Sequence, residues 1–119
     1  ESSSFHIMCI TQLRSGEIWV GSSGRGIFRI RKDTGTGEQM TDIPDVSEHA
    51  HYGVIYEDRH GSIWIGVNGT GLLRYDPSTR TSKIYTRAVL DGGSTISGMA
   101  EDHSGNFLLS TGTTAYYYD

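Results

Sequence analysis

Apolar and polar residues alternate along this chain in short runs, and turns rich in glycine separate the runs. Nowhere does the i, i+3, i+4, i+7 spacing of an amphipathic helix persist, whereas alternation with period two is typical of half-buried strands. The pattern therefore predicts an all-β chain. We expect strands at 7–12, 17–21, 26–31 and 38–43, then at 52–57, 62–66, 71–76 and 82–87, and finally at 96–101, 106–110 and 114–118.

The chain also contains an internal repeat. GEIWVGSSGRGIFRI at 16–30 matches GSIWIGVNGTGLLRY at 61–75 almost position for position, and GNFLLSTGTTAYYYD at 105–119 is a more divergent third copy. The copies start 45 residues apart and then 44 residues apart. A regular spacing of this size marks a structural unit that is repeated along the chain.

A period of about 40 to 50 residues with four strands per unit is typical of a β-propeller blade. We therefore expect a partial propeller of two nearly complete four-stranded antiparallel blades and a truncated third, with repeats at about 5–50, 51–94 and 95–119. An irregular β-sandwich or an open β-meander is the alternative that the strand count permits. The outer sheets of a partial propeller would leave edges that need a partner, either the remaining blades or other copies of the chain.

Composition and charge narrow the possible partners. Glycine makes up 16 of the 119 residues, which fits a chain with many tight turns. The net charge is −4 with both signs interspersed, so we expect no binding to nucleic acid. No apolar run approaches the roughly 20 residues of a membrane span, so we expect no direct membrane contact from this segment. The single cysteine, Cys9, lies in an apolar stretch and is interpreted as a small buried hydrophobic residue.

The segment EDRHGSIWIGVNGTGLLRYDPST at 57–79 resembles the two-component regulator propeller repeat. That repeat has an acidic pair, a glycine turn, a Trp-hydrophobic-Gly strand and a Gly-hydrophobic-Arg-Tyr-Asp strand. The first copy departs from it by lacking the acidic pair and by carrying Ile30-Arg31 in place of Tyr-Asp. In the third copy Leu108 replaces the tryptophan, and Ser110 and Ala115 are aligned with two glycines.

The resemblance implies a function as well as a fold. Such repeats build periplasmic sensor propellers of bacterial hybrid two-component systems, joined through a membrane helix to a histidine kinase. The chain is then expected to lie in the periplasm and to sense a carbohydrate-like ligand for signal transduction, with no cofactor and no catalytic residue of its own.

Several prominent residues have structural interpretations. Trp19 and Trp64 occupy the same repeat position and are expected to pack between sheets, each with its indole N–H directed at a carbonyl. Asp58 and Asp102 precede a glycine by three residues, which suits a carboxylate that accepts backbone N–H bonds in a turn. Glu57 and Asp58 are adjacent on a strand, so their side chains point to opposite faces and do not form an acid–base pair.

The candidate site lies on the loops at one face of the propeller. We expect the connections at 21–25, 67–70 and 111–113 to share this face with 47–51 and 90–95, which lead into the inner strands. Loops of this kind commonly carry function. Their donors and acceptors suit sugar hydroxyls, and the arginine among them suits an acidic sugar. The candidate ligand-binding residues are Arg25, His49, His51, Asn68, Thr70 and Asp91.

Two other functions stay open. The chain could be a protein-interaction scaffold, with its function in a surface patch. It could also belong to a propeller lyase or hydrolase, for which His49, His51 and Glu57 are the only plausible acid–base residues. The i, i+2 spacing of the two histidines could supply two metal ligands, but no third is evident and we predict no metal site. Common catalytic motifs are lacking, so we expect no enzyme.

Overall fold

The computed structural model describes residues 6–41, 43, 50–68, 71–86, 96–111 and 115–118. These residues form three antiparallel sheets and no helix. The first sheet contains β1 (His6–Gln12), β2 (Ile18–Ser23), β3 (Ile27–Arg31) and β4 (Thr36–Gln39). The second contains β5 (Tyr52–Glu57), β6 (Ile63–Val67), β7 (Gly71–Asp76) and β8 (Thr81–Thr86). The third contains β9 (Gly98–Glu101), β10 (Phe107–Ser110) and β11 (Ala115–Tyr118).

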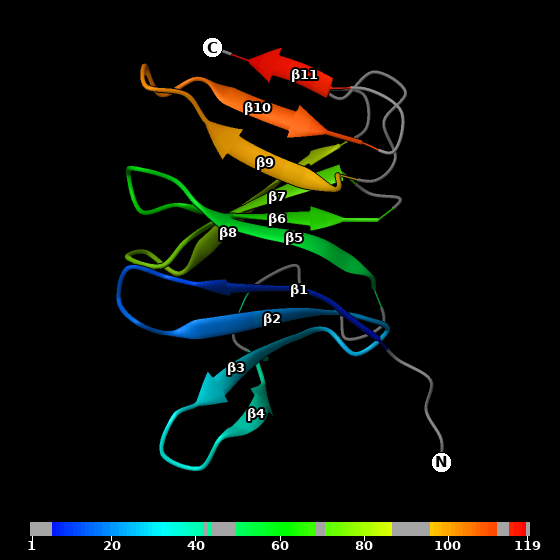
Figure 1. The fold of residues 1–119 in the computed structure, drawn as a ribbon, viewed down its shortest axis with the longest axis vertical. Helices are drawn as coiled ribbons and strands as arrows, with labels where there is room; N and C mark the ends of the chain where they lie inside the picture. The colour runs from blue at the N-terminus through cyan, green and yellow to red at the C-terminus, as the bar shows by residue number, and fades with distance from the viewer. Residues whose placement is uncertain are drawn as a thin grey trace.

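The sheets are the blades of a partial propeller, as the repeat predicts. Within each sheet the strands pair in chain order, and the three sheets follow one another along the long axis of the molecule (Figure 1). The first strand of the first sheet, β1, lies against the first strand of the second, β5, and β5 in turn contacts β9. We call the three sheets blades 1, 2 and 3.

The turn between the first two strands is built in the same way in all three blades. Gly16, Gly61 and Gly105 adopt φ of 97°, 90° and 89°, a region that favours glycine over other residues. Each donates its backbone N–H to the carbonyl of the residue three positions earlier, at 2.8, 3.1 and 3.1 Å. The glycine that begins each copy of the sequence repeat is therefore required by the backbone of this turn.

The inner strands of blades 1 and 2 share a second irregularity. The register of β1 against β2 shifts between Ile7 and Cys9, and that of β5 against β6 shifts between Tyr52 and Val54. These two places are 45 residues apart, which is the spacing of the repeat. Residues separated by 45 positions therefore occupy equivalent places in the two blades.

Two sequence predictions need correction. The strand expected at 38–43 is β4 and ends at Gln39, because the chain leaves the sheet after Met40, whose backbone N–H bonds to the Ile27 carbonyl at 2.8 Å. Met40 is nevertheless buried in the core, which explains the apolar pattern there.

The alignment of the third repeat also needs correction. In blade 3, Ser110 pairs with Ala115 just as Gly66 pairs with Leu72. Ala115 thus corresponds to Leu72 and not to a glycine, because the last connection is one residue shorter.

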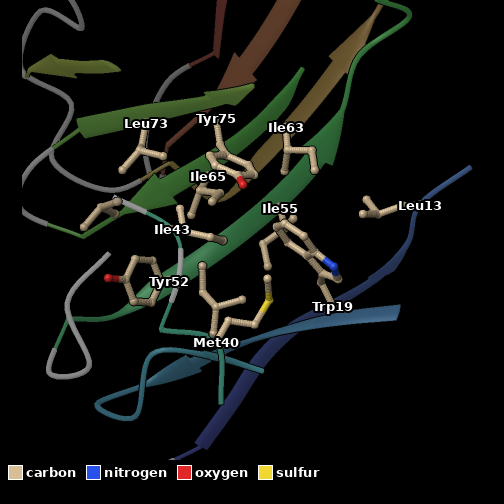
Figure 2. Packing of buried hydrophobic residues seen from close by; sticks show 12 residues of the cluster. Leu13, Trp19, Met40, Ile43, Tyr52, Ile55, Ile63, Ile65, Leu73 and Tyr75 are labelled. Atoms are coloured by element: carbon tan, nitrogen blue, oxygen red, sulfur yellow. The ribbon is translucent and has the colours of Figure 1, made fainter. Parts of the chain in front are cut away.

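The apolar core lies between the blades. A first cluster joins blades 1 and 2 and includes Trp19, Ile55 and Tyr75, whose side chains converge between the two sheets (Figure 2). A second cluster joins blades 2 and 3 around Trp64, which packs against Phe107 with ring centroids 5.2 Å apart. Each blade interface thus contains one tryptophan, in agreement with the predicted packing role.

Candidate functional site

The loops of blades 1 and 2 meet at one end of β5. Ser23 Oγ and His51 Nδ1 share a hydrogen bond of 2.7 Å, and the same two residues form an isolated antiparallel bridge. The backbone N–H of Gly24 bonds to the Ala50 carbonyl at 3.1 Å, and that of Asn68 bonds to the His51 carbonyl at 2.9 Å. His51 therefore connects the β2–β3 turn of blade 1 to the residue that follows β6 in blade 2.

Two further candidate residues flank this junction. The side-chain oxygen of Asn68 is buried and has no hydrogen-bond partner among the described residues. A buried polar atom of this kind usually has a partner, so this oxygen is an unsatisfied hydrogen-bond acceptor. Arg25 is exposed on the β2–β3 turn, and its backbone is fixed because its N–H bonds to Ser22 Oγ at 3.1 Å and its carbonyl accepts a bond from Gln39 Nε2 at 2.8 Å.

Three candidate residues, His49, Thr70 and Asp91, lie outside the described residues. Of the described candidates, His51 and Asn68 are joined by the backbone bond above, and Arg25 lies on the turn that begins next to Ser23. Sequence reasoning did not select Ser23, although it is the side-chain partner of His51. It is the last residue of β2, with serine and glycine neighbours, and no pattern in the sequence indicated its contact with a histidine 28 residues later.

The turns between the first and second strands lie at the opposite end of the blades. Asp58 is 2% exposed and has both carboxylate oxygens occupied. Oδ1 accepts the backbone N–H groups of His60 and Ser62, each at 2.9 Å, and Oδ2 accepts the indole N–H of Trp64 at 2.8 Å. The predicted turn-capping role of Asp58 is therefore confirmed, whereas the expected carbonyl partner of Trp64 is a carboxylate.

Blade 1 provides an acceptor for the indole N–H of its tryptophan from a different residue. Leu13 occupies the position equivalent to Asp58, so the turn carries no carboxylate there. The indole N–H of Trp19 instead bonds to Glu17 Oε1 at 3.0 Å, and Arg29 approaches the other Glu17 oxygen at 3.4 Å. A carboxylate again replaces the predicted carbonyl, because it is the acceptor within reach of the indole at this edge of the sheet.

Blade 3 combines the turn-capping aspartate with a tyrosine. Asp102 Oδ1 accepts the backbone N–H groups of Ser104 and Asn106, each at 2.9 Å, so its predicted role is also confirmed. Tyr117 donates its hydroxyl to Oδ2 at 2.6 Å. Hydrogen bonds to the ionised form favour that form, and those from Tyr117 and Asn106 lower the pKa of Asp102 to about 2.

An arginine in each of the first two turns reaches to the following blade. Arg14 donates its backbone N–H to Glu57 Oε1 at 2.7 Å and its guanidinium to the Asp58 carbonyl. Arg59 repeats this, with its backbone N–H on Glu101 Oε1 at 3.0 Å and its guanidinium on the Asp102 carbonyl at 3.1 Å. Sequence reasoning missed this contact, although the 45-residue spacing of the two arginines was a signal for it.

The candidate acid–base residues do not converge. His51 precedes β5 and Glu57 ends it, so the two residues are separated by the length of the strand, roughly 20 Å at about 3.3 Å per residue. The Glu57 carboxylate is also bonded to Arg14. Within the part of the chain that the structure describes, no three histidine, cysteine or acidic residues are grouped so that they could hold a metal ion.

No protein-family model and no curated protein matches the chain. Solved structures from B. thetaiotaomicron do match it. Two are of one extracellular domain, named in one case as a proposed one-component system and in the other as a proposed hybrid two-component system, with TM-scores of 0.70 and identities of 25% and 24%. A third is the extracellular domain of another proposed hybrid two-component system, with a TM-score of 0.73 and 19% identity.

Each match covers 95% of this chain and 15% of the matched chain. The chain therefore spans a small part of these extracellular domains. The matches agree with the resemblance to two-component sensor propellers that the repeat at 57–79 carries. In the described ranges of the chain, no helix has the length and apolar character that crossing a membrane requires.

Proposed function

We propose that this chain is a ligand-sensing segment of a periplasmic propeller in a bacterial two-component regulator. The observation that carries the proposal is the likeness of 95% of the chain to extracellular domains of proposed hybrid two-component systems, at a TM-score of 0.70 and 24% identity for one of them. Placement in the periplasm has the same support. The histidine kinase that receives the signal lies in another part of the parent protein.

The proposed ligand is carbohydrate-like and binds where the loops of blades 1 and 2 meet. Arg25, His51 and Asn68 supply a guanidinium, an imidazole and a carboxamide there, which are planar hydrogen-bonding groups that suit sugar hydroxyls. The unpartnered Asn68 oxygen supports this location, because a sugar hydroxyl would supply its missing donor. An acidic sugar would also form a charge-assisted bond with Arg25.

The position of this junction also suits signal transmission. His51 is bonded to blade 1 through Ser23 and to blade 2 through Asn68, so a ligand held by these groups contacts both blades. A ligand can shift a conformational equilibrium only if it binds the two arrangements with different affinity. A site shared by two blades meets this condition whenever their relative position changes.

The test is a binding measurement on the 119-residue chain with two probes, a neutral hexose oligosaccharide and a uronic acid oligosaccharide, titrated into fluorescently labelled protein. We expect Asn68→Ala to weaken binding of both probes. We expect Arg25→Ala to weaken the acidic probe about tenfold to a hundredfold and the neutral probe less, because a charge-assisted bond is lost only with the acidic one. Melting temperatures should stay within a few degrees of the wild type.

His60→Ala is the matched control, because His60 is exposed at the opposite end of β5. Arg59 is unsuitable for this purpose, since it holds blade 3. Failure of the wild-type chain to bind either probe would contradict the carbohydrate ligand. A loss of binding in His60→Ala alone would show that the ligand binds at the opposite end of β5 from the proposed junction. Capture of a protein in place of both sugars would favour an interaction scaffold.

A further inference from the structure

Both of the blades that meet at His51 hold its backbone. On the blade 1 side, Gly21 allows a close approach, since a Cβ there would lie 2.9 Å from the Tyr52 carbonyl oxygen. Two residues later, Ser23 forms an antiparallel bridge with His51. On the blade 2 side, the His51 carbonyl accepts the backbone N–H of Asn68 at 2.9 Å. The imidazole is therefore attached to a fixed backbone at an interface between two blades within the chain.

The bond between the side chains of Ser23 and His51 is specific to this junction. Contacts that hold adjacent blades together recur at both interfaces, as Arg14 and Arg59 show when each binds the glutamate that ends the inner strand of the following blade. The residue equivalent to Ser23 in blade 2 is Asn68, 45 positions later, and its side-chain oxygen has no hydrogen-bond partner among the described residues. The hydroxyl–imidazole bond is therefore not required at every blade interface.

The length of this bond indicates which side chain donates the proton. A neutral imidazole has one N–H donor and one nitrogen acceptor, whereas a hydroxyl can act as either. Ser23 Oγ lies 2.7 Å from His51 Nδ1. This separation is typical of a hydroxyl donor, because N–H donors lie most often about 2.9–3.0 Å from an oxygen acceptor. The geometry thus favours a bond from the Ser23 hydroxyl to Nδ1, which leaves the ring proton on Nε2.

This arrangement decides what His51 offers to a ligand. The two nitrogens of an imidazole face in different directions, so the one that is not bonded to Ser23 carries the N–H of an exposed ring. Arg25, two residues after Ser23, adds a guanidinium, which has donors and no acceptor. The group that completes these hydrogen bonds must therefore be an acceptor.

We infer that Ser23 is a positioning residue that fixes the ring of His51 with Nε2–H as a hydrogen-bond donor, and that the ligand group bound there is the carboxylate of an acidic sugar. The inference rests on the proposed sensing role and adds to it a ligand class and one residue. A ring that is already held in its binding orientation loses less conformational freedom when the ligand binds. A carboxylate suits this donor best, because hydrogen bonds to an ionised acceptor are the stronger ones.

The first measurement is made on the protein without ligand. Nitrogen-15 NMR of the 119-residue chain, at a pH at which the histidine rings are neutral, reports which ring nitrogen of His51 is protonated. We expect Nε2–H in the wild type, a mixture of both forms in Ser23→Ala, and Nε2–H again in Ser23→Thr, which restores the hydroxyl. The ring of His60, exposed at the opposite end of β5, should be the same in all three proteins.

The second measurement compares binding of a uronic acid oligosaccharide with that of the same oligosaccharide after reduction of its carboxyl groups. We expect Ser23→Ala to bind the acidic probe about tenfold more weakly than the wild type, and Ser23→Thr to bind it nearly as well. His51→Gln should keep more affinity than His51→Asn, because the longer side chain places its amide N–H near the position of Nε2. Ser104→Ala is the matched control, since Ser104 is exposed in the β9–β10 turn at the other end of the blades.

Two results would overturn the inference and leave the sensing role intact. One is Nδ1–H as the main form of His51 in the wild type, and the other is equal affinity of the wild type and Ser23→Ala for the acidic probe. Equal affinity of the wild type for the acidic and the reduced probe would overturn the acidic ligand. Failure of the wild type to bind either probe, with Nε2–H still found by NMR, would instead contradict the proposed carbohydrate ligand on which the inference rests.

Discussion

The carboxylate–donor pair that supports each blade is built from different residues in the three blades. Blade 2 uses Asp58 and the Trp64 indole, whereas blade 1 uses Glu17 for Trp19. Blade 3 has lost the tryptophan, and Tyr117 donates its hydroxyl to Asp102 in its place. The spacing of the aspartates was enough to predict their turn-capping role. The contact of the tyrosine with Asp102 could not be predicted, because the tyrosine lies on another strand and the absence of the tryptophan does not indicate which residue takes its place.

At the residue scale, replacing Tyr117 tests whether its hydroxyl holds Asp102 ionised. We expect the pKa of Asp102 in Tyr117→Phe to rise from about 2 towards the ordinary value near 3.9, since the largest cause of the lowered pKa is removed. NMR titration of the side-chain carboxyl of Asp102 measures this directly. Tyr85→Phe, which removes a hydroxyl from a tyrosine packed on Trp64, is the control and should leave that pKa unchanged.

The same substitution predicts a change in the pH dependence of stability. Because the folded-state pKa of Asp102 lies below its unfolded value, ionised Asp102 stabilises the fold above about pH 4, and this contribution is lost as the pH falls towards 2. The unfolding free energy of the wild type should therefore fall more steeply across this window than that of Tyr117→Phe. Parallel profiles for the two proteins would show that the hydroxyl has no influence on the carboxylate.

At the scale of strands, alternation and glycine turns predicted the elements well wherever both signals occurred together. The strands expected at 52–57 and 71–76 are β5 and β7 with the same ends. The prediction failed at β4, where apolar residues continue beyond the strand because they fill the core between blades. For the site, the sequence located the loops, but not which side chains meet, since those contacts join segments that are distant in the chain.

One cross-strand pair shows how neighbouring strands share a fixed space. In blades 1 and 2 the pairs are Cys9–Gly21 and Val54–Gly66, with the glycine on the second strand. In blade 3 the order is reversed, and Gly98 faces Ser110. A Cβ at Gly66 would lie 2.6 Å from Val54 Cγ1, and one at Gly98 would lie 2.8 Å from Ser110 Oγ. Each blade therefore has room for one side chain at this pair.

This exchange predicts a compensating pair of substitutions in blade 2. We expect Gly66→Ser to lower the free energy of unfolding by about 1–3 kcal/mol, because it overpacks the site. Adding Val54→Gly to reproduce blade 3 should cost less than the sum of the two single changes, as measured by urea denaturation in a double-mutant cycle. Gly37→Ala is the control and should be nearly neutral, since its Cβ would have no neighbour closer than 3.6 Å. If the two changes in unfolding free energy were strictly additive, the side chains at positions 54 and 66 would not compete for the same space.

At the scale of the whole molecule, the described residues form a short stack in which blade 2 packs against both of the other blades. Among the described residues, the cluster between blades 1 and 2 has twelve buried members, and the cluster between blades 2 and 3 has four. Proteins built from stacked repeats are stabilised by the repeats themselves and by the interfaces between neighbours. With fewer buried side chains at its interface with blade 2, blade 3 of this chain should open more readily than blades 1 and 2.

Hydrogen exchange on two variants, each with one buried side chain shortened to alanine, tests this order of stability. Leu109 is buried in the smaller cluster, so Leu109→Ala should speed exchange in β9, β10 and β11 and leave β1, β2 and β3 nearly as protected as in the wild type. Ile65 is 0% exposed in the larger cluster, so Ile65→Ala should reduce protection in all three blades, because blade 2 supports both neighbours. Each change should cost about 2–5 kcal/mol of local or global stability. If Leu109→Ala speeds exchange equally in β2 and β10, the three blades unfold as one cooperative unit and the stack is not divided at the second interface.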